Sequence, residues 1–315
     1  MKRHILFIFL PGALLAACHS PTLPTYTDTP TSGSITILVD DSYRPMMQVE
    51  IDTFMKIYKY AAIKVEYLPE SEVFKELLAV EKDSIRLAVT ARDLNESEKS
   101  FLDSCRIIPR KNKIAIDAVA LIMHQHNPDT LLTFEQVGEI MRGKIKTWKD
   151  LDSHMSPDTI RIVFDRSGSA NTRFLQEKFL GKQPFPSNTY AVQSNAEVVD
   201  YVGKTPGALG VISVNWISDH DSPSANHYLE KIKVVAISLP DTNGSSPEFR
   251  LPLQAFIALK EYPLIRDVFI INREGRNGLG TGIAAFVAGD QGQRLIKLMG
   301  MLPATLPVRL VQIHE

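Results

Sequence analysis

Residues 165–174 read DRSGSANTRF and mark a change of pattern in the chain. The β-rich segment 160–164 precedes them, and a helical pattern follows them. A strand that ends in a Ser/Gly turn and opens a helix leaves several backbone N–H groups unpaired at the positive end of the helix dipole. This stretch is therefore typical of an anion-binding turn.

Arg173 is expected near the first turn of this helix, where a cation is disfavoured unless an anion lies beside it. We therefore expect a negative group close to Arg173. An alternative needs no ligand: Ser169 or Asn171 caps the helix, and Arg173 pairs with Glu177 one turn further on. Both interpretations remain open on these residues alone.

Composition limits the classes of protein that fit. A chain of 315 residues with 44% hydrophobic content can bury a large core, and we expect two domains. Lys and Arg total 35 against 36 Asp and Glu, so no basic excess indicates nucleic-acid binding. The Gly-rich stretch 275–282 lacks the strand–GxGxxG–helix context of a dinucleotide site and is predicted to be a turn, so no cofactor is expected.

The N-terminus has the pattern of an export signal. Lys2 and Arg3 precede a nearly continuous apolar run over residues 5–17, which is too short for the roughly 17 to 25 residues of a membrane-spanning helix. The ending Leu-Ala-Ala-Cys at residues 15–18 resembles the lipobox of bacterial lipoproteins, which implies a signal peptide over residues 1–17 and a lipidated Cys18. The Pro- and Thr-rich segment 18–33 is predicted to be an extended tether to the membrane.

Strands and helices alternate after the tether. Strands are expected at residues 35–39, 63–67 and 87–89, with helices between them at residues 46–58 and from Ser71 onward. This alternation favours a mostly parallel sheet covered by helices, in which ligands gather at the carboxyl ends of strands. Four polar residues follow such strand ends: Asp41, Ser42, Thr90 and Arg92.

The second half of the chain is also predicted to be α/β. The apolar run 114–123, interrupted by Asp117, has the pattern of a strand crossing between lobes. Capping boxes are expected at Asn95 with Glu98 and at Thr133 with Gln136. Asn195 is expected to cap a helix, and further strands are expected at residues 233–237, 253–259 and 268–271.

Four segments carry a resemblance to a known family, namely residues 116–120 (IDAVA), 140–148 (IMRGKIKTW), 207–212 (GALGVI) and 289–302, which contains Gln-Gly-Gln. The chain resembles the substrate-binding proteins of bacterial ABC phosphate uptake systems. The resemblance implies an α/β, two-lobed periplasmic-binding-protein fold of type II, with the ligand cleft between the lobes and two hinge crossover strands. Residues 34–118 plus 261–315 are expected to form lobe 1, and residues 119–260 lobe 2.

The resemblance also implies a ligand site. Many family members have a Ser-Gly-Thr turn at a helix start, and the matching positions here are Ser169, Ala170 and Asn171. Well-studied phosphate binders place an aspartate at the end of the third strand, whereas this chain has Thr-Ala-Arg at residues 90–92, so Asp40 or Asp41 is a candidate for the missing acceptor. The predicted ligand-binding residues are Asp41, Ser42, Thr90, Arg92, Ser167, Gly168, Ser169, Ala170, Asn171 and Arg173.

The resulting hypothesis is a monomeric, exported lipoprotein that binds inorganic phosphate or a similar oxyanion for an ABC permease, without catalysis. One alternative is a sensory or interaction domain with the same fold. Another is a phosphatase-like hydrolase, but no histidine lies in a recognised catalytic motif. His124 and His126 are expected to share one strand face, and two ligands fall short of a metal site, so no metal is expected.

Overall fold

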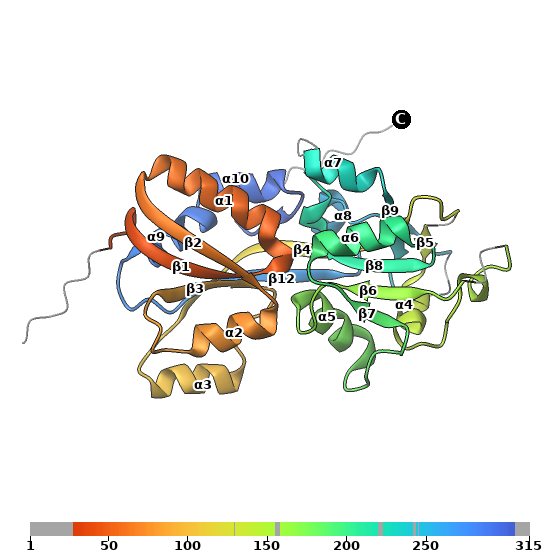
Figure 1. The fold of residues 1–315 in the computed structure, drawn as a ribbon, viewed down its shortest axis with the longest axis horizontal. Helices are drawn as coiled ribbons and strands as arrows, with labels where there is room; N and C mark the ends of the chain where they lie inside the picture. The colour runs from red at the N-terminus through yellow and green to blue at the C-terminus, as the bar shows by residue number, and fades with distance from the viewer. Residues whose placement is uncertain are drawn as a thin grey trace, which may run out of the picture.

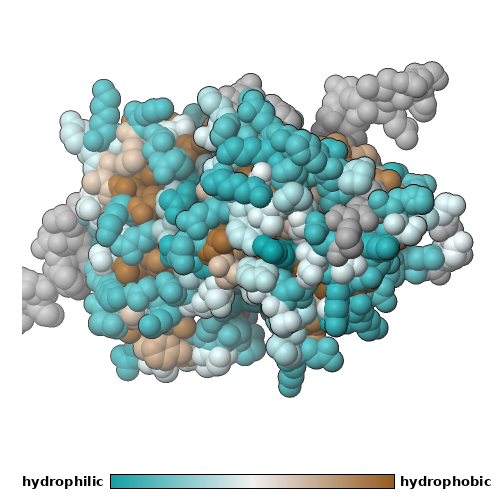
Figure 2. Space-filling view, turned by 45° about the vertical axis from the view of Figure 1, so that its right-hand side comes forward, coloured by the Kyte–Doolittle hydropathy of each residue, from teal (hydrophilic) through white to brown (hydrophobic). Residues whose placement is uncertain are grey.

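The computed structural model describes residues 28–128, 130–154, 158–219, 223–241, 244 and 246–305, which form two lobes lying side by side (Figure 1). The predicted signal peptide, Cys18 and most of the predicted tether lie outside these residues. Within the described part of the chain, no helix is long and apolar enough to cross a membrane. Figure 2 shows one face as mostly hydrophilic, with hydrophobic residues in scattered patches.

Lobe 1 is built on the parallel strands β2, β1 and β3, with β12 antiparallel beside β3. β3 is buried along its whole length, and α1 buries Met47, Ile51 and Phe54 at helical spacing, which explains why these apolar runs fold together. The lobe comprises β1 (Ser32–Asp40), η1 (Asp41–Tyr43), α1 (Arg44–Ile57), β2 (Tyr60–Leu68), α2 (Glu70–Leu78), β3 (Ile85–Thr90), α3 (Glu96–Ser104), β12 (Ile265–Asn272), α9 (Leu279–Ala288), α10 (Asp290–Leu298) and β13 (Leu302–Pro303).

Lobe 2 is built on the parallel strands β8, β6 and β7, with α6 packed on β8. It comprises β5 (Leu131–Leu132), α4 (Phe134–Met141), η2 (Trp148–Asp150), β6 (Arg161–Phe164), α5 (Ala170–Leu175), η3 (Gln176–Leu180), β7 (Thr189–Ala191), α6 (Asn195–Lys204), β8 (Ala208–Ser213), η4 (Val214–Trp216), α7 (Pro223–Leu229), β9 (Ile232–Val234), β10 (Ala236–Ser238), β11 (Phe249–Arg250) and α8 (Gln254–Ala258). The prediction that this half is again α/β is confirmed.

One long strand, β4 (Arg110–His124), joins the lobes. It pairs antiparallel with β12 as far as Ala118 and with β8 from Val119 onward, so the prediction of a crossing strand is confirmed. Strands of both lobes thereby form one sheet, in the order β2-β1-β3-β12-β4-β8-β6-β7. The change of partner supports the predicted boundary between residues 118 and 119, while the residue limits of the lobes stay a prediction because β4 belongs to both.

Several local predictions are confirmed and several are wrong. The capping boxes at Asn95 and Thr133 are present. The expected strand over residues 253–259 is instead the one-turn helix α8, because the pattern LPLQAFIAL fits both periods over so short a run. Ser194 caps α6 in place of Asn195, and α2 begins after Pro69 without a serine cap.

The folded part of the chain also begins earlier than the predicted end of the tether. Asp28 forms salt bridges with Arg86 and Arg276 of lobe 1, and its carboxylate accepts the backbone N–H of Leu279 at 3.1 Å. The polar composition of residues 18–33 gave no sign of these contacts, because both arginines come from distant parts of the sequence.

Candidate functional site

Most of the predicted ligand residues meet where the strand ends of lobe 1 face the start of α5 in lobe 2; α2 and α5 face each other across this boundary in Figure 1. The backbone N–H of Ala170, the first residue of α5, donates to Oδ2 of Asp40 at 3.2 Å. Arg173, one turn further on, forms a salt bridge with Glu70 of α2. We call this boundary the interlobe cleft.

The turn before α5 is shaped by two residues of the quoted stretch. Ser169 is the N-cap: its Oγ accepts the N–H of Thr172 at 3.3 Å and donates to Asp165. Gly168 has φ +78°, and a Cβ there would lie 2.3 Å from Oγ of Ser71 in lobe 1. Only glycine fits this approach, and its carbonyl accepts the Ser71 N–H at 3.0 Å. Of the two candidate caps, Ser169 and Asn171, the structure has Ser169.

Arg173 has the negative neighbours that its position required. Its Nε and Nη2 donate to Glu70, and its Nη1 donates to Glu177 at 2.8 Å. The pair with Glu177 matches the ligand-free interpretation, whereas the pair with Glu70 crosses the cleft and was not predicted. The start of α5 and Arg173 thus each hold a carboxylate of lobe 1.

Three aspartates gather at the same place. Nδ2 of Asn195 donates to Oδ2 of Asp165 at 3.1 Å and to Oδ2 of Asp41 at 3.3 Å. Burial, together with the charge of Glu70, raises the pKa of Asp40 to about 6, and burial together with the charge of Asp40 raises the pKa of Asp165 to about 7. Both carboxyl groups therefore hold a proton more readily than an exposed aspartate does, because each is buried beside another negative charge.

A buried arginine from the crossover region closes the cluster. Arg266 of β12 donates from Nε to Asp117 at 2.9 Å and from Nη2 to Oδ1 of Asn171 at 2.8 Å. Oγ of Ser213 donates to the other oxygen of Asp117 at 2.7 Å. Burial alone would lower the pKa of Arg266, but the neighbouring Tyr43 and Asp117 outweigh it and raise the pKa, so the guanidinium stays charged.

The structure brings most of the predicted residues together, but two are placed elsewhere. Arg92 directs both Nη atoms to Glu98, at 2.7 and 2.8 Å, and its guanidinium lies over the ring of Phe74, so it stabilises the start of α3 within lobe 1. Ser167 is exposed in the turn before α5. Thr90 is buried at the end of β3 and donates to the carbonyl of Arg92.

Other residues of the cluster were not predicted as ligand-site residues: Glu70, Asp117, Asp165, Asn195 and Arg266. Two had a visible signal, since Asp165 opens the quoted stretch and Asp117 interrupts an apolar run. Glu70 and Arg266 had none, because each meets its partner across about 100 or more residues of sequence.

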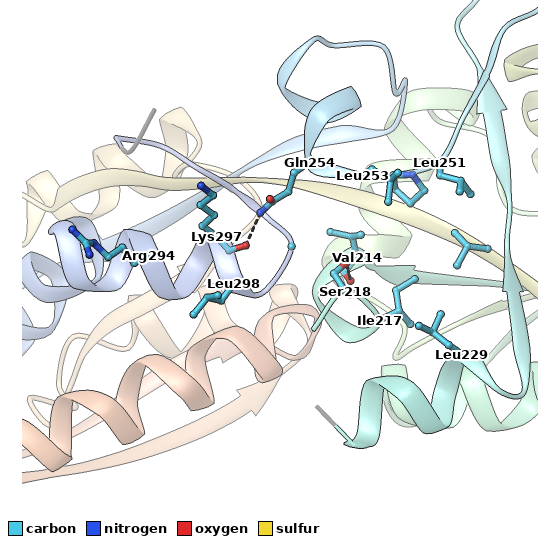
Figure 3. Close-up of a pocket in the computed structure, with 13 residues that line it drawn as sticks. Val214, Ile217, Ser218, Leu229, Leu251, Leu253, Gln254, Arg294, Lys297 and Leu298 are labelled. Carbon is cyan, nitrogen blue, oxygen red and sulfur yellow. Dashed lines mark hydrogen bonds between the residues drawn. The ribbon is translucent and has the colours of Figure 1, made fainter. Parts of the chain in front are cut away.

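A pocket of different character lies away from the predicted ligand residues. It is lined mainly by apolar side chains, among them Ile217, Leu229 and Leu298, and it lies between the end of α10 and the segments around η4 and β9 (Figure 3). None of the predicted ligand residues lines it. Among the described residues no group of three or more His, Cys, Asp or Glu side chains is arranged to hold a metal ion, and the rings of His124 and His126 pack at 5.0 Å between centroids.

Comparisons with known proteins agree with this architecture. A family model described as "PBP superfamily domain" matches residues 24–291. The phosphate-binding protein PstS of Staphylococcus epidermidis is 26% identical over 253 residues, which is 79% of this chain and 72% of the relative.

Two solved structures are similar in fold. A putative phosphate ABC transporter substrate-binding protein with bound phosphate, from Clostridium perfringens, has a TM-score of 0.69 at 21% identity, covering 87% of this chain and all of the other. An ABC-type phosphate transport receptor from Vibrio cholerae has a TM-score of 0.60 at 22% identity, covering 86% of this chain and all of the other. The predicted two-lobed α/β periplasmic-binding-protein fold is thereby confirmed.

Proposed function

The chain belongs to the PBP superfamily, and on this basis we propose that it is an extracytoplasmic solute-binding protein that captures inorganic phosphate between its lobes for an ABC permease. One observation carries the proposal. Lobe 2 already binds carboxylate groups of lobe 1 at the cleft, since the Ala170 N–H donates to Asp40 and Arg173 pairs with Glu70. In this arrangement the carboxylate oxygens stand in for oxygens of a bound oxyanion.

Binding follows from an exchange of partners. When the lobes separate, Asp40 and Glu70 leave with lobe 1, and the α5 start and Arg173 become available to a tetrahedral anion. Hydrogen bonds to a charged group contribute about 1.5 to 3 kcal/mol each, so a few of them, less the desolvation of the anion, give the roughly 8 kcal/mol of micromolar affinity. Closure then buries the ligand.

The position of Asp40 favours phosphate over sulfate as the ligand. It is buried at the end of β1 and lies at the start of α5, where a bound anion would contact it. A carboxylate there accepts a hydrogen bond from the P–OH group of hydrogen phosphate. Sulfate carries no proton at neutral pH, so its oxygens would be repelled by the negative charge of the carboxylate. Asp40 thus replaces the aspartate missing at residues 90–92.

The N-terminal signal supports attachment to a membrane. We propose that residues 1–17 are removed on export and that Cys18 carries the lipid, with the Pro- and Thr-rich segment as tether and a monomeric protein beyond it. Binding and release are sufficient for this role, so no catalytic step is assigned to the cleft. Recovery of the full chain in the soluble fraction of the producing cells would contradict the anchor and leave the ligand unaffected.

Titration calorimetry of the chain after Cys18 tests the ligand. We expect one-to-one binding of phosphate, with weaker or no binding of sulfate, molybdate and a simple phosphonate. If none of the four anions gave a heat of binding, the proposed function would be wrong. A preference for sulfate would contradict only the assignment of phosphate.

A further inference from the structure

Three buried polar groups in the cleft have no hydrogen-bond partner among the described residues: Nη1 of Arg266, Oγ of Ser42 and the hydroxyl of Tyr43. All three side chains are buried, Ser42 and Tyr43 completely. Most buried polar atoms in proteins are paired, because leaving one without a partner costs about 1–3 kcal/mol. Three such groups in one region therefore require an explanation.

The three groups belong to one cluster. The Arg266 guanidinium lies 5.5 Å from the centre of the Tyr43 ring, and Ser42 precedes Tyr43 in η1. The carbonyl of Ser42 accepts Nδ2 of Asn215 at 2.7 Å, which fixes η1 against lobe 2. Nη2 of Arg266 contacts Asn171, the residue after Ala170, so the guanidinium adjoins the start of α5.

The chemistry of these groups favours an acceptor-rich ligand. A guanidinium can only donate hydrogen bonds, and the two hydroxyls can each donate one. The two arginines predicted from the sequence are occupied in this structure, because every guanidinium nitrogen of Arg173 and both Nη atoms of Arg92 donate to carboxylates. Arg266 is a buried arginine of this cluster that keeps a spare donor.

We infer that Arg266 is a second cation that binds the oxyanion beside Arg173, with the hydroxyls of Ser42 and Tyr43 as further donors. Asp117 and Asn171 hold the guanidinium by Nε and Nη2 and leave Nη1 available to the ligand. This inference rests on the proposed function and deepens it: a small tetrahedral oxyanion is held by the crossover strand β12 and η1 as well as by α5.

The test measures phosphate binding by calorimetry with the wild-type chain and two Arg266 variants. Arg266→Lys keeps the charge beside Asp117 but loses the fork of donors. The double variant Asp117→Asn with Arg266→Gln replaces the buried ion pair by neutral amides, so it leaves no unpaired buried charge. We expect both to bind phosphate at least about tenfold more weakly, as expected for a lost charge-assisted hydrogen bond.

Arg273→Gln is the matched control. Arg273 follows β12, is equally buried, and donates to the carbonyls of Ile85, Ala79 and Lys82 in lobe 1, so phosphate binding should change less than twofold. Circular dichroism establishes folding, and if the double variant does not fold, Arg266→Lys alone decides. A folded Arg266 variant that binds phosphate within about threefold of wild type would overturn the inference and leave the proposed function standing. Absence of phosphate binding by the wild type would overturn both.

Discussion

A single acidic residue of α1 makes the clearest prediction at the residue scale. Glu50 is fully buried, and neither of its carboxyl oxygens has a hydrogen-bond partner among the described residues. Burial raises the pKa of Glu50 to about 9. The folded protein therefore holds this proton more tightly than the unfolded chain does, so Glu50 lowers stability progressively as the pH rises from about 4.5 toward 9.

Replacing Glu50 by Gln removes this titration while keeping the shape of the side chain. We expect Glu50→Gln to raise the free energy of unfolding by about 2–4 kcal/mol at pH 8 and to change it little at pH 4.5. Urea unfolding at the two pH values measures the difference. Glu72→Gln, on the exposed face of α2, is the control and should change the free energy of unfolding by less than about 0.5 kcal/mol. An equal effect of Glu50→Gln at both pH values would contradict the assignment.

The residues that sequence could and could not assign differ in the range of their contacts. Ser169 was identifiable as one of two candidate caps, because its acceptor role involves Thr172, only three residues away. Glu70 and Arg266 were not identifiable, because the partners that give them a role are brought close only by the fold. Sequence patterns indicate contacts between residues that are close along the chain. Several contacts of this cleft instead join residues of the two lobes that are far apart in the sequence.

At the scale of elements, the contact between α6 and β8 depends on a glycine. A Cβ at Gly210 would lie 2.7–2.8 Å from side-chain atoms of Val202, Ile122 and Val198, closer than real contacts allow. We expect Gly210→Ala to destabilise the protein by about 1–3 kcal/mol, measured by urea unfolding, because the helix must move off the strand. Gly275→Ala is the control, since nothing lies within 4 Å of its added Cβ. Equal stability of the two variants would contradict this packing argument.

Helices were predictable where a capping residue accompanied the periodic spacing of apolar residues. The capping boxes at Asn95 and Thr133 located α3 and α4 correctly. α8 was missed because a helix of five residues spans little more than one turn, so neither its period nor its ends distinguish it from a strand. Its N-cap, Leu253, gives no polar signal.

At the scale of the whole molecule, β4 crosses from the lobe 1 half of the sheet to the lobe 2 half. Relative motion of the lobes therefore involves bending at this crossing strand. Closure in this structure is supported by carboxylates of lobe 1, Asp40 and Glu70, bound to lobe 2. They occupy the lobe 2 donors, the Ala170 N–H and the Arg173 guanidinium, that the proposed ligand needs. Ligand and protein carboxylates therefore compete for one set of sites, and weakening the protein's contacts should favour both opening and binding.

Glu70→Gln tests this competition. The neutral amide pairs weakly with Arg173, so the ligand-free protein should open more often and show a larger radius of gyration in small-angle X-ray scattering. Phosphate should then bind more tightly, by about threefold or more, because Arg173 no longer has to exchange one anion for another. Glu177→Gln is the matched control: it also removes a carboxylate from Arg173, but from within the same helical segment of lobe 2, so it should leave the radius of gyration unchanged. The competition would be contradicted if Glu70→Gln left the radius of gyration unchanged or weakened phosphate binding. The contact between Glu70 and Arg173 would then have a role other than competing with the ligand.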